Sequence, residues 1–401
     1  MSTVKLARRL SVVEPSPTLA VSAKAAKLKA EGIDVISFGA GEPDFDTPVH
    51  IKDAAKKALD AGATKYTLVE GTVPLRKAVA KWIGTAHGLT VDPSEVIVSS
   101  GAKQSIYNAV FALIDEGDEV IIPTPAWVSY NDIVKLAGGR PVNVPTKASE
   151  NFQVRAEDVA KAITPRTKMI LVCSPSNPTG AIYDESTLRA LAKLAVEKDL
   201  WLMTDDIYRT LVYGDGKFFQ PATIGPDVRA KTIIIDGVSK AFAMTGWRVG
   251  FTVAPKPVVE AMATLQGQST THAAAVAQAA ALAAIEGPTD ELEKMRVEFD
   301  KRRKTMVARL REIPGVTCVE PKGAFYAFPD LSAFIGKKTP EGKKIENDVQ
   351  LCEWLIEAAK VAVVMGSAFH APGFVRLSYA TSMKNVEEGV RRMAEALPKL
   401  T

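Results

Sequence analysis

A lysine and an arginine lie between two candidate strands in the middle of the chain. Lys240 closely follows the apolar run Thr232–Asp236, and Arg248 comes eight positions later, just before Gly250–Ala254. A lysine at the carboxyl end of a buried strand projects to the edge where α/β proteins bind ligands. Desolvation or a nearby cation lowers the pKa of such an amine and makes it a nucleophile. An isolated Ser-Lys pair is more often a solvated loop, so the surrounding sequence must decide.

Two further segments are suited to binding anions. Ser99–Lys103 follows a candidate strand and opens a helix, so its free backbone amides and the helix dipole can hold an anion. Arg376 lies in the apolar run Val375–Tyr379, where a guanidinium is costly unless paired, and its fork matches a carboxylate. Small residues are common at strand–helix joins, and an edge-strand arginine often points into solvent. Both alternatives stay open at this point.

The elements that would position these residues are short apolar strands alternating with helical patterns. Helices are expected over Gln104–Ile114 and Glu185–Lys198, between runs that are apolar nearly throughout, as in strands covered on both faces. This alternation predicts an α/β fold, a three-layer domain with a mostly parallel sheet of seven strands. The candidate strands are Val96–Ser99, Glu119–Ile122, Pro141–Pro145, Lys168–Cys173, Trp201–Thr204, Thr232–Asp236 and Gly250–Ala254.

The last hundred residues change character. A long charged amphipathic segment, Asp290–Glu312, leads into short strands and two helices, Asp348–Ala359 and Asn385–Leu397. This grouping predicts a second, small α+β domain, made of residues 1–46 together with 296–401, beside a large domain over 47–295. Active sites favour such boundaries and the carboxyl ends of parallel strands.

Composition narrows the functional classes. The 401 residues are 47% hydrophobic with a formal net charge of +4, which suits a large core and offers no basic block for nucleic acid or acidic membranes. Three separated cysteines form no cluster with the four histidines, which predicts a reducing compartment and no metal site. Ala273–Ile285 is too short to span a membrane, and Met1–Leu10 is not followed by the apolar stretch of a secretory signal, so we expect a cytoplasmic protein.

Five ordered motifs resemble those of class I (fold type I) aminotransferases, which depend on pyridoxal 5'-phosphate. The segment Asp236–Gly250 resembles their cofactor-lysine motif, and the similarity is greatest to the bacterial aspartate aminotransferases of subgroup Iβ. The other motifs are Gly39-Ala-Gly-Glu-Pro-Asp-Phe-Asp-Thr-Pro48, Ser174-Pro-Ser-Asn-Pro-Thr-Gly180, Asp205-Asp-Ile-Tyr208 and Val375-Arg-Leu-Ser378.

The resemblance implies the roles of a cofactor site. Lys240 would carry pyridoxal 5'-phosphate as a Schiff base and act as general base and acid, with Asp205 keeping the ring nitrogen protonated. Tyr208 and Asn177 would donate to the phenolate oxygen of the ring. The catalytic residues would thus be Lys240, Asp205 and Tyr208. The remaining cofactor contacts would be Trp127 on the ring face, and Gly101, Ala102, Lys103, Ser239, Arg248 and the neighbouring subunit's Tyr66 on the phosphate of a homodimer with shared active sites.

The same resemblance implies the substrate contacts. Arg376 would bind the α-carboxylate of the substrate, assisted by the backbone amide of Gly41. Lys103 would bind a second, distal carboxylate, although a solvated lysine at a helix start is a serious alternative. The expected substrate site also includes Trp127, Asn177 and Ser16.

Three positions depart from the family pattern or stay undecided. Gly237 stands where many relatives place a phosphate-binding serine, so one phosphate hydrogen bond has no assigned donor. Glu14 stands where relatives that accept prephenate carry a basic residue, which disfavours prephenate. His272 is open between a specificity residue and a structural one.

The expected activity is transfer of an amino group from an L-amino acid, preferably aspartate, to a 2-oxo acid, preferably 2-oxoglutarate, by a ping-pong mechanism. The alternatives are an aromatic or broad-specificity aminotransferase, a C–S lyase on the same fold, and a non-catalytic regulator. Regulators of this kind carry a fused DNA-binding segment, of which the sequence shows no sign. A nicotinamide enzyme is disfavoured because no Gly-x-Gly-x-x-Gly follows the early strands.

Overall fold

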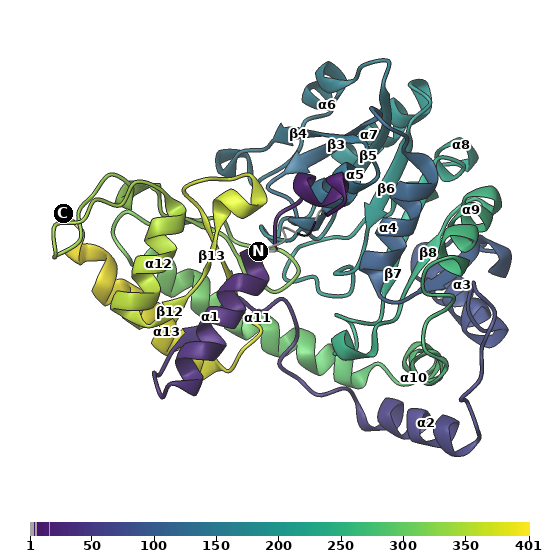
Figure 1. Cartoon of the computed structure of the whole chain (residues 1–401), viewed down its shortest axis with the longest axis horizontal. Coiled ribbons are helices and arrows are strands. Elements are labelled where there is room, and N and C mark those ends of the chain that lie inside the picture. Colours follow the sequence, from purple (N-terminus) through teal and green to yellow (C-terminus); the bar gives the residue numbers. More distant parts are fainter. Residues whose placement is uncertain (1–3, 5, 16) are drawn as a thin grey trace.

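A seven-stranded sheet dominates the structure, a computed structural model that describes every residue except 1–3, 5 and 16 (Figure 1). Its strand order is β2-β8-β7-β6-β5-β3-β4. All neighbours pair in parallel except β8, which is antiparallel to both of its neighbours. The predicted mostly parallel sheet of seven strands is confirmed. Its strands are β2 (Val96–Ser99), β3 (Glu119–Thr124), β4 (Arg140–Pro145), β5 (Thr167–Cys173), β6 (Trp201–Asp205), β7 (Thr232–Gly237) and β8 (Gly250–Val253).

Helices cover both faces of this sheet, which explains the continuous apolar runs. Along β5, Met169 and Leu171 join one buried cluster, whereas Ile170 and Val172 join another on the opposite face. Alternating residues of a strand point to opposite faces, so a strand buried on both sides is apolar throughout. The helices of this region are α2 (Val49–Asp60), α3 (Val73–His87), α4 (Ala102–Leu113), α5 (Ser129–Leu136), α6 (Ala156–Ala162), α7 (Glu185–Glu197), α8 (Pro226–Arg229), α9 (Lys256–Gly267) and α10 (Ala275–Glu286).

A second group of elements, here called the small-sheet region, contains β1, β9–β14, α1, α12 and α13. Its sheets have the orders β1-β12, β10-β14-β13 and β11-β9. The N-terminal strand therefore pairs with a strand more than three hundred residues later. The elements are α1 (Pro17–Ala30), β1 (Ile36–Ser37), β9 (Thr317–Cys318), β10 (Tyr326–Ala327), β11 (Pro329–Asp330), α12 (Asp348–Ala359), β12 (Val361–Ala362), β13 (Val364–Met365), β14 (Val375–Ser378) and α13 (Met383–Ala396).

One long helix, α11 (Asp290–Arg311), joins the two regions (Figure 1). The seven-stranded sheet and the helices that cover it are here called the large-sheet region. Near the start of α11, Arg296 donates to the carbonyl of Val212 in this region at 3.2 Å. Near its end, Arg309 pairs with Glu387 of α13 at 3.0 Å. The proposed domain boundary between residues 295 and 296 therefore falls inside a continuous helix.

Short 3₁₀ helices occupy several connections. They are η1 (Arg8–Val12), η2 (Pro93–Glu95), η3 (Ala148–Glu150), η4 (Pro221–Thr223), η5 (Thr245–Trp247), η6 (Ser332–Phe334), η7 (Gly366–Phe369) and η8 (Leu397–Lys399). In the part of the chain that the structure describes, no helix combines the length and the apolar character needed to cross a membrane.

Candidate active site

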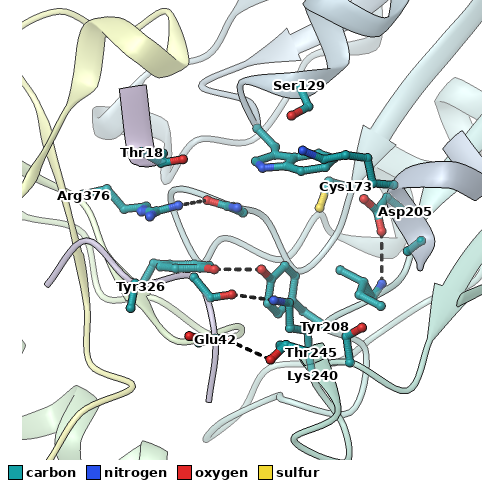
Figure 2. Close-up of a pocket in the computed structure, with 18 of the residues that line it drawn as sticks. Thr18, Glu42, Ser129, Cys173, Asp205, Tyr208, Lys240, Thr245, Tyr326 and Arg376 are labelled. Carbon is teal, nitrogen blue, oxygen red and sulfur yellow. Dashed lines mark hydrogen bonds between the residues drawn. The ribbon is translucent and has the colours of Figure 1, made fainter. Parts of the chain in front are cut away.

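A pocket of about 580 Å³ lies at the carboxyl edge of the large sheet, against the small-sheet region (Figure 2). It brings together residues from distant parts of the sequence and from both regions. The predicted site residues that line it are Gly41, Ala102, Lys103, Trp127, Asn177, Asp205, Tyr208, Ser239, Lys240, Arg248 and Arg376.

The strand directions explain why these residues meet. β2, β3, β5, β6 and β7 run the same way, so the loops that follow them all emerge at one edge. The antiparallel β8 begins at that same edge, and Arg248 precedes it by two positions. Because β8 runs the opposite way, Arg248, which precedes it, lies at the same edge as the residues that follow the parallel strands.

Asp205 ends β6 and lies deep in the pocket wall, with 4% of its surface exposed. Its carboxylate accepts hydrogen bonds from the hydroxyl of Tyr130 at 2.5 Å and from the backbone amide of Ile207 at 3.3 Å. Burial raises the pKa of the Asp205 carboxyl to about 6, and these two donors oppose that rise. The Asp205 side chain is therefore not a solvated loop residue.

Asp206 is also buried, and it points into a separate polar cluster. Its carboxylate accepts from the amide of Gln220 at 2.5 Å. Behind it, Arg209 pairs with Asp236 at 2.6 Å, with both side chains almost completely buried. Burial, followed by the nearby Asp236 charge, raises the pKa of Asp206 well above its usual range. Only the first aspartate of the pair therefore faces the pocket.

Lys240 projects from the loop after β7 into the pocket, where its amine donates to the carbonyl of Gly41 at 2.5 Å. Protein atoms surround the amine on most sides, although the side chain remains accessible through the pocket. Burial lowers the pKa of Lys240 to about 8, the carboxylate of Glu42 opposes this, and Arg376 and Arg248 add to it. The lysine therefore has the desolvated, cation-flanked surroundings that make an amine nucleophilic.

Arg376 lies in the middle of the small-sheet region with 2% of its surface exposed. It donates to the side-chain oxygen of Asn177 at 3.0 Å and to the carbonyl of Gly39 at 2.9 Å. Its Nε has no partner, and among the described residues no carboxylate forms an ion pair with it. Figure 2 shows the Arg376 side chain pointing into the pocket. The edge-strand alternative is wrong, and the buried charge faces the pocket without an anion.

The start of α4 forms a narrow backbone cradle beside Arg248. Gly101 has a φ of 90°, and a Cβ at this position would collide with the Arg248 guanidinium. A Cβ on Gly250 would collide with the backbone of Ala102. The first amides of a helix have no partner within the helix, so the cradle combines free amides, a positive helix end and a guanidinium.

The structure gives a reason for the glycine at position 237. A Cβ on Gly237 would lie 3.0 Å from the Cα of Gly250 and 3.1 Å from the carbonyl of Val249. Both contacts involve backbone atoms and are tighter than most Cβ contacts, so a serine at position 237 would require β7 and β8 to give way by a few tenths of an ångström. Ser239, two residues further on, lines the pocket and also has a hydroxyl.

Comparison with known proteins identifies the family. Residues 33–393 match the family described as "Aminotransferase class I and II". The chain belongs to this family. It is 45% identical over 397 residues to a "Probable aspartate/prephenate aminotransferase" of Aquifex aeolicus, covering 98% of this chain and 99% of that one.

Two solved structures extend the comparison to three dimensions. The aspartate aminotransferase of Rhizobium meliloti is 44% identical with a TM-score of 0.96, and the match covers both chains completely. The aspartate aminotransferase of Thermus thermophilus with maleate is 43% identical with a TM-score of 0.92, covering 98% of this chain and all of that one. The predicted family and its fold are therefore confirmed, and the protein is an aspartate aminotransferase-like transaminase.

Four positions considered from the sequence lie away from the pocket of this aminotransferase or cannot be placed. Tyr66 is 90% exposed and packs edge-on against His272, with ring centroids 5.6 Å apart. Both nitrogens of His272 are engaged locally, with the Thr67 amide at 3.2 Å and the Ala273 carbonyl at 2.7 Å. Glu14 is exposed and does not line the pocket. Ser16 lies outside the described residues.

Two tyrosines of the aminotransferase site had no predicted role. Tyr130 donates to Asp205, and Tyr326 lies 2.8 Å from Tyr208 through their hydroxyls (Figure 2). Burial raises the pKa of all three phenols above the usual range, so each keeps its proton. The sequence signal that could have found them is a tyrosine within an apolar segment, because a buried tyrosine hydroxyl usually has a hydrogen-bond partner.

Proposed function

We propose that this protein uses pyridoxal 5'-phosphate to transfer the amino group of an L-amino acid, aspartate by preference, to a 2-oxo acid, 2-oxoglutarate by preference, in two successive half-reactions. The observation that carries the proposal is the pair of buried cations around one pocket. Arg376 is buried and has no carboxylate partner among the residues that the structure describes, and the amine of Lys240 faces the same space. A buried guanidinium is costly until an anion pairs with it, so the pocket is suited to an anionic substrate beside a nucleophilic amine.

The residues of the pocket fit the cofactor. The cradle of Gly101, Ala102 and Lys103 would hold its phosphate together with Arg248 and Ser239, because close backbone approach leaves amides and a cation as the exposed groups. The amine of Lys240 would attach it, Trp127 would cover one ring face, Asp205 would pair with the ring nitrogen, and Asn177 and Tyr208 would donate to the ring oxygen. When bound, the cofactor supplies an electron sink for the charge left by the departing α-proton.

Lys240 is the residue that would move the proton. With a pKa of about 8, a sizeable fraction of its amine is neutral near that pH and can accept the proton of the substrate α-carbon. Asp205 would hold a proton at the ring nitrogen, because a carboxylate kept out of water favours a cationic partner. Tyr130 holds the Asp205 side chain in place by donating to it at 2.5 Å.

The substrate carboxylates have two candidate partners. Arg376 would bind the α-carboxylate, because it lines the pocket with one terminal nitrogen at Asn177 and the other at the Gly39 carbonyl. Lys103, whose ammonium lies 4.8 Å from the centre of the Trp127 ring, would bind the distal carboxylate of aspartate or glutamate. Lys103 is an exposed residue of the pocket lining, and partial burial followed by the Arg248 charge lowers the pKa of its ammonium.

A homodimer with shared sites belongs to this proposal. Tyr66 is exposed outside the pocket of its own chain, and its edge contact with His272 fixes the direction of its ring. In a symmetric pair of chains, an exposed tyrosine of this kind can complete the phosphate site of the partner. The oligomeric state in solution, measured by light scattering, tests this part.

Prephenate is a second candidate oxo acid. The named activity of the Aquifex aeolicus relative, aspartate/prephenate aminotransferase, favours it. Glu14 disfavours it, because relatives that accept prephenate have a basic residue there. Prephenate therefore belongs in the test as an amino acceptor beside 2-oxoglutarate.

The test is a panel of single half-reactions with the cofactor-loaded enzyme. The visible absorption of the bound cofactor would be followed after addition of aspartate, glutamate, tyrosine, phenylalanine, methionine or arogenate in turn. We expect aspartate to react fastest, and Lys103→Ala to slow aspartate by roughly tenfold while leaving phenylalanine within twofold. The matched control is Lys135→Ala on α5, which removes a partly exposed lysine outside the pocket.

Two results would contradict the proposal. Equal rates for aspartate and methionine would remove the role given to Lys103. Release of ammonia and pyruvate without an oxo-acid acceptor would identify a C–S lyase instead.

A further inference from the structure

Tyr326 lies where three predicted parts of the site meet. Its hydroxyl is 2.8 Å from that of Tyr208. The Arg376 guanidinium lies over its ring, 4.6 Å from the centre. A Cβ on Gly41, whose carbonyl accepts from Lys240, would be 3.4 Å from the same hydroxyl. Tyr326 thus contacts the proposed carboxylate site and the proposed donor to the ring oxygen, and it adjoins the lysine-binding carbonyl.

Backbone hydrogen bonds hold the chain before Tyr326 against the segment that follows Tyr208. The amide of Ala324 donates to the carbonyl of Leu211, and the amide of Tyr213 donates to the carbonyl of Lys322, both at 2.9 Å. Leu211 follows Tyr208 by three residues, so the two tyrosines belong to segments that are bonded to each other. Tyr326 is fully buried, which fixes its ring relative to that of Tyr208.

The number of protons constrains what this pair can do. Both phenols are protonated, so the two hydroxyls carry two protons, and only one of them can lie in the hydrogen bond between them. If Tyr208 donated to Tyr326, its own proton would be unavailable to any other acceptor. If Tyr326 donates, the proton of Tyr208 is free to point into the pocket.

We propose that Tyr326 is a positioning residue that donates its hydroxyl proton to Tyr208 and thereby turns the proton of Tyr208 toward the ring oxygen of the bound cofactor. The inference deepens the proposed function and rests on it. A hydroxyl that accepts one hydrogen bond becomes a stronger donor in the next, so Tyr326 also strengthens the contact that Tyr208 makes. A donor at the ring oxygen disperses its negative charge and weakens the hold on a proton at the neighbouring Lys240 nitrogen.

The test uses the cofactor-loaded enzyme and the pH at which its visible absorption band changes, which reports the proton at the Lys240 nitrogen. Tyr326→Phe removes only the hydroxyl. We expect the midpoint to rise by roughly half to one pH unit, the size expected for loss of one neutral hydrogen bond. Binding of maleate should change by less than about twofold, because phenylalanine keeps the ring face under Arg376.

Two further variants separate positioning from a general structural effect. In a Tyr208→Phe background, Tyr326→Phe should leave the midpoint unchanged, because the effect passes through the Tyr208 hydroxyl. Tyr379→Phe is the matched control. It removes the hydroxyl of another fully buried tyrosine, which donates to the carbonyl of Ala324 at 3.2 Å, and it should not shift the midpoint.

The failures can be told apart. An unmoved midpoint in Tyr326→Phe, or an equal shift with and without the Tyr208 hydroxyl, would overturn this inference while leaving the proposed function standing. Wild-type protein that shows no visible cofactor band at all would overturn the proposed function and this inference together.

Discussion

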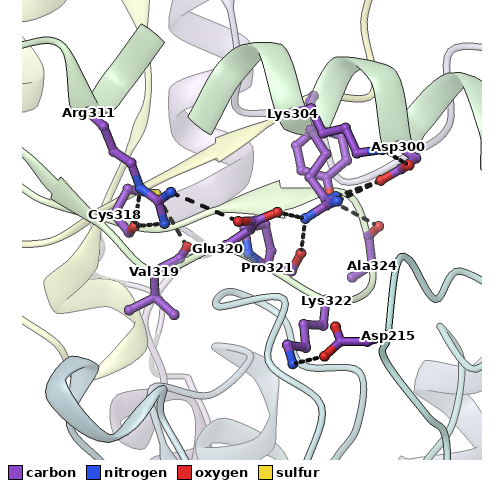
Figure 3. Close-up of polar contacts among 12 residues, drawn as sticks. Asp215, Asp300, Lys304, Arg311, Cys318, Val319, Glu320, Pro321, Lys322 and Ala324 are labelled. Carbon is purple, nitrogen blue, oxygen red and sulfur yellow. Dashed lines mark hydrogen bonds and ion pairs between the residues drawn. The ribbon is translucent and has the colours of Figure 1, made fainter. Parts of the chain in front are cut away.

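Two buried arginines in this molecule have opposite surroundings. Arg303, on α11, is 4% exposed and forms ion pairs with Asp300 at 2.7 Å and Glu320 at 2.6 Å (Figure 3). Arg376, in the pocket wall, is 2% exposed and has only the neutral oxygens of Asn177 and Gly39 (Figure 2). The first guanidinium is neutralised within the chain and joins segments of the fold. The second lacks an acid among the described residues, which is the condition expected of a site that binds an anion.

The same contrast holds for the wider surroundings of the two arginines. The network around Arg303 also includes the carbonyl of Pro321 at 3.0 Å and the ring of Tyr213. The pocket instead holds ionisable groups whose pKa values are shifted by burial, Asp205 upward and Lys240 downward. Substitutions should therefore affect stability at the first site and activity at the second.

The largest effect is expected at Lys240. Lys240→Ala removes the group proposed to attach the cofactor and to move the α-proton, so turnover should fall by roughly 10³-fold or more. Steady-state kinetics measures this, with Lys322→Ala, a surface lysine paired with Asp215 (Figure 3), as the control. A Lys240→Ala enzyme with a tenth of normal turnover would place the chemistry on another group.

Arg303→Met tests the structural half of the contrast. It removes the buried cation that joins Asp300 to Glu320, although Lys304 still lies 2.8 Å from Asp300 and Arg311 3.9 Å from Glu320. We expect the free energy of unfolding to fall by about 1–2 kcal/mol. The loss is smaller than for a fully buried pair because half of the Glu320 side chain is exposed. Urea titration measures it, and kcat/KM of the folded enzyme should stay within about twofold. Unchanged stability would remove the contrast between the two arginines.

Replacing Asp205 should raise the stability of the cofactor-free protein, which is the opposite of the effect expected at Arg303. Its pKa is raised to about 6 in the fold from an ordinary value of 3.8, so ionisation is penalised, and the cofactor-free protein should lose stability as pH rises from 4 to 6. Asp205→Asn removes this penalty and should stabilise the cofactor-free protein by about 1–3 kcal/mol at pH 8, with little gain at pH 4. Urea titrations at both pH values measure the difference. A variant less stable than wild type at pH 8 would contradict it.

Arg376→Lys keeps the charge and loses the fork. We expect kcat/KM for aspartate to fall by roughly tenfold to a hundredfold, because charged hydrogen bonds contribute about 1.5–3 kcal/mol each. The free energy of unfolding should change by less than about 1 kcal/mol, since no carboxylate in the described part of the chain is paired with this arginine. Kinetics and urea titration on the same preparation provide both values. Normal kinetics would remove Arg376 from the substrate site.

Much of the large sheet could be predicted because its signals are local. The run predicted as Val96–Ser99 matches β2, and the other six predicted strands differ from the observed ones by one or two residues at an end. Burial on both faces makes each strand apolar throughout, and that is readable without knowing its neighbours. The N-terminal helix α1 and the strand β1 were not predicted, because β1 has only two residues and its partner β12 lies far along the chain.

The site divides in the same way. Asp205 ends a strand, and Lys240 and Asn177 lie in the loops just after a strand, so their position could be predicted from the sequence around them. Tyr130 and Tyr326 could not, because their partners Asp205 and Tyr208 are 75 and 118 residues away. The glycine at 237 was a departure from the pattern in the sequence, and the close approach of β7 to β8 at this position could be found only from the structure.

The unbroken course of α11 has a mechanical consequence. At about 1.5 Å per residue, its 22 residues form a rod of roughly 33 Å that is anchored at Val212 near one end and at Glu387 near the other. At this junction, therefore, a rigid helix connects the two sheet regions, where a flexible linker would let them move independently. A protease needs an extended, accessible peptide, and a continuous helix does not offer one. Cleavage of the native enzyme within α11 would therefore require the helix to unfold locally first.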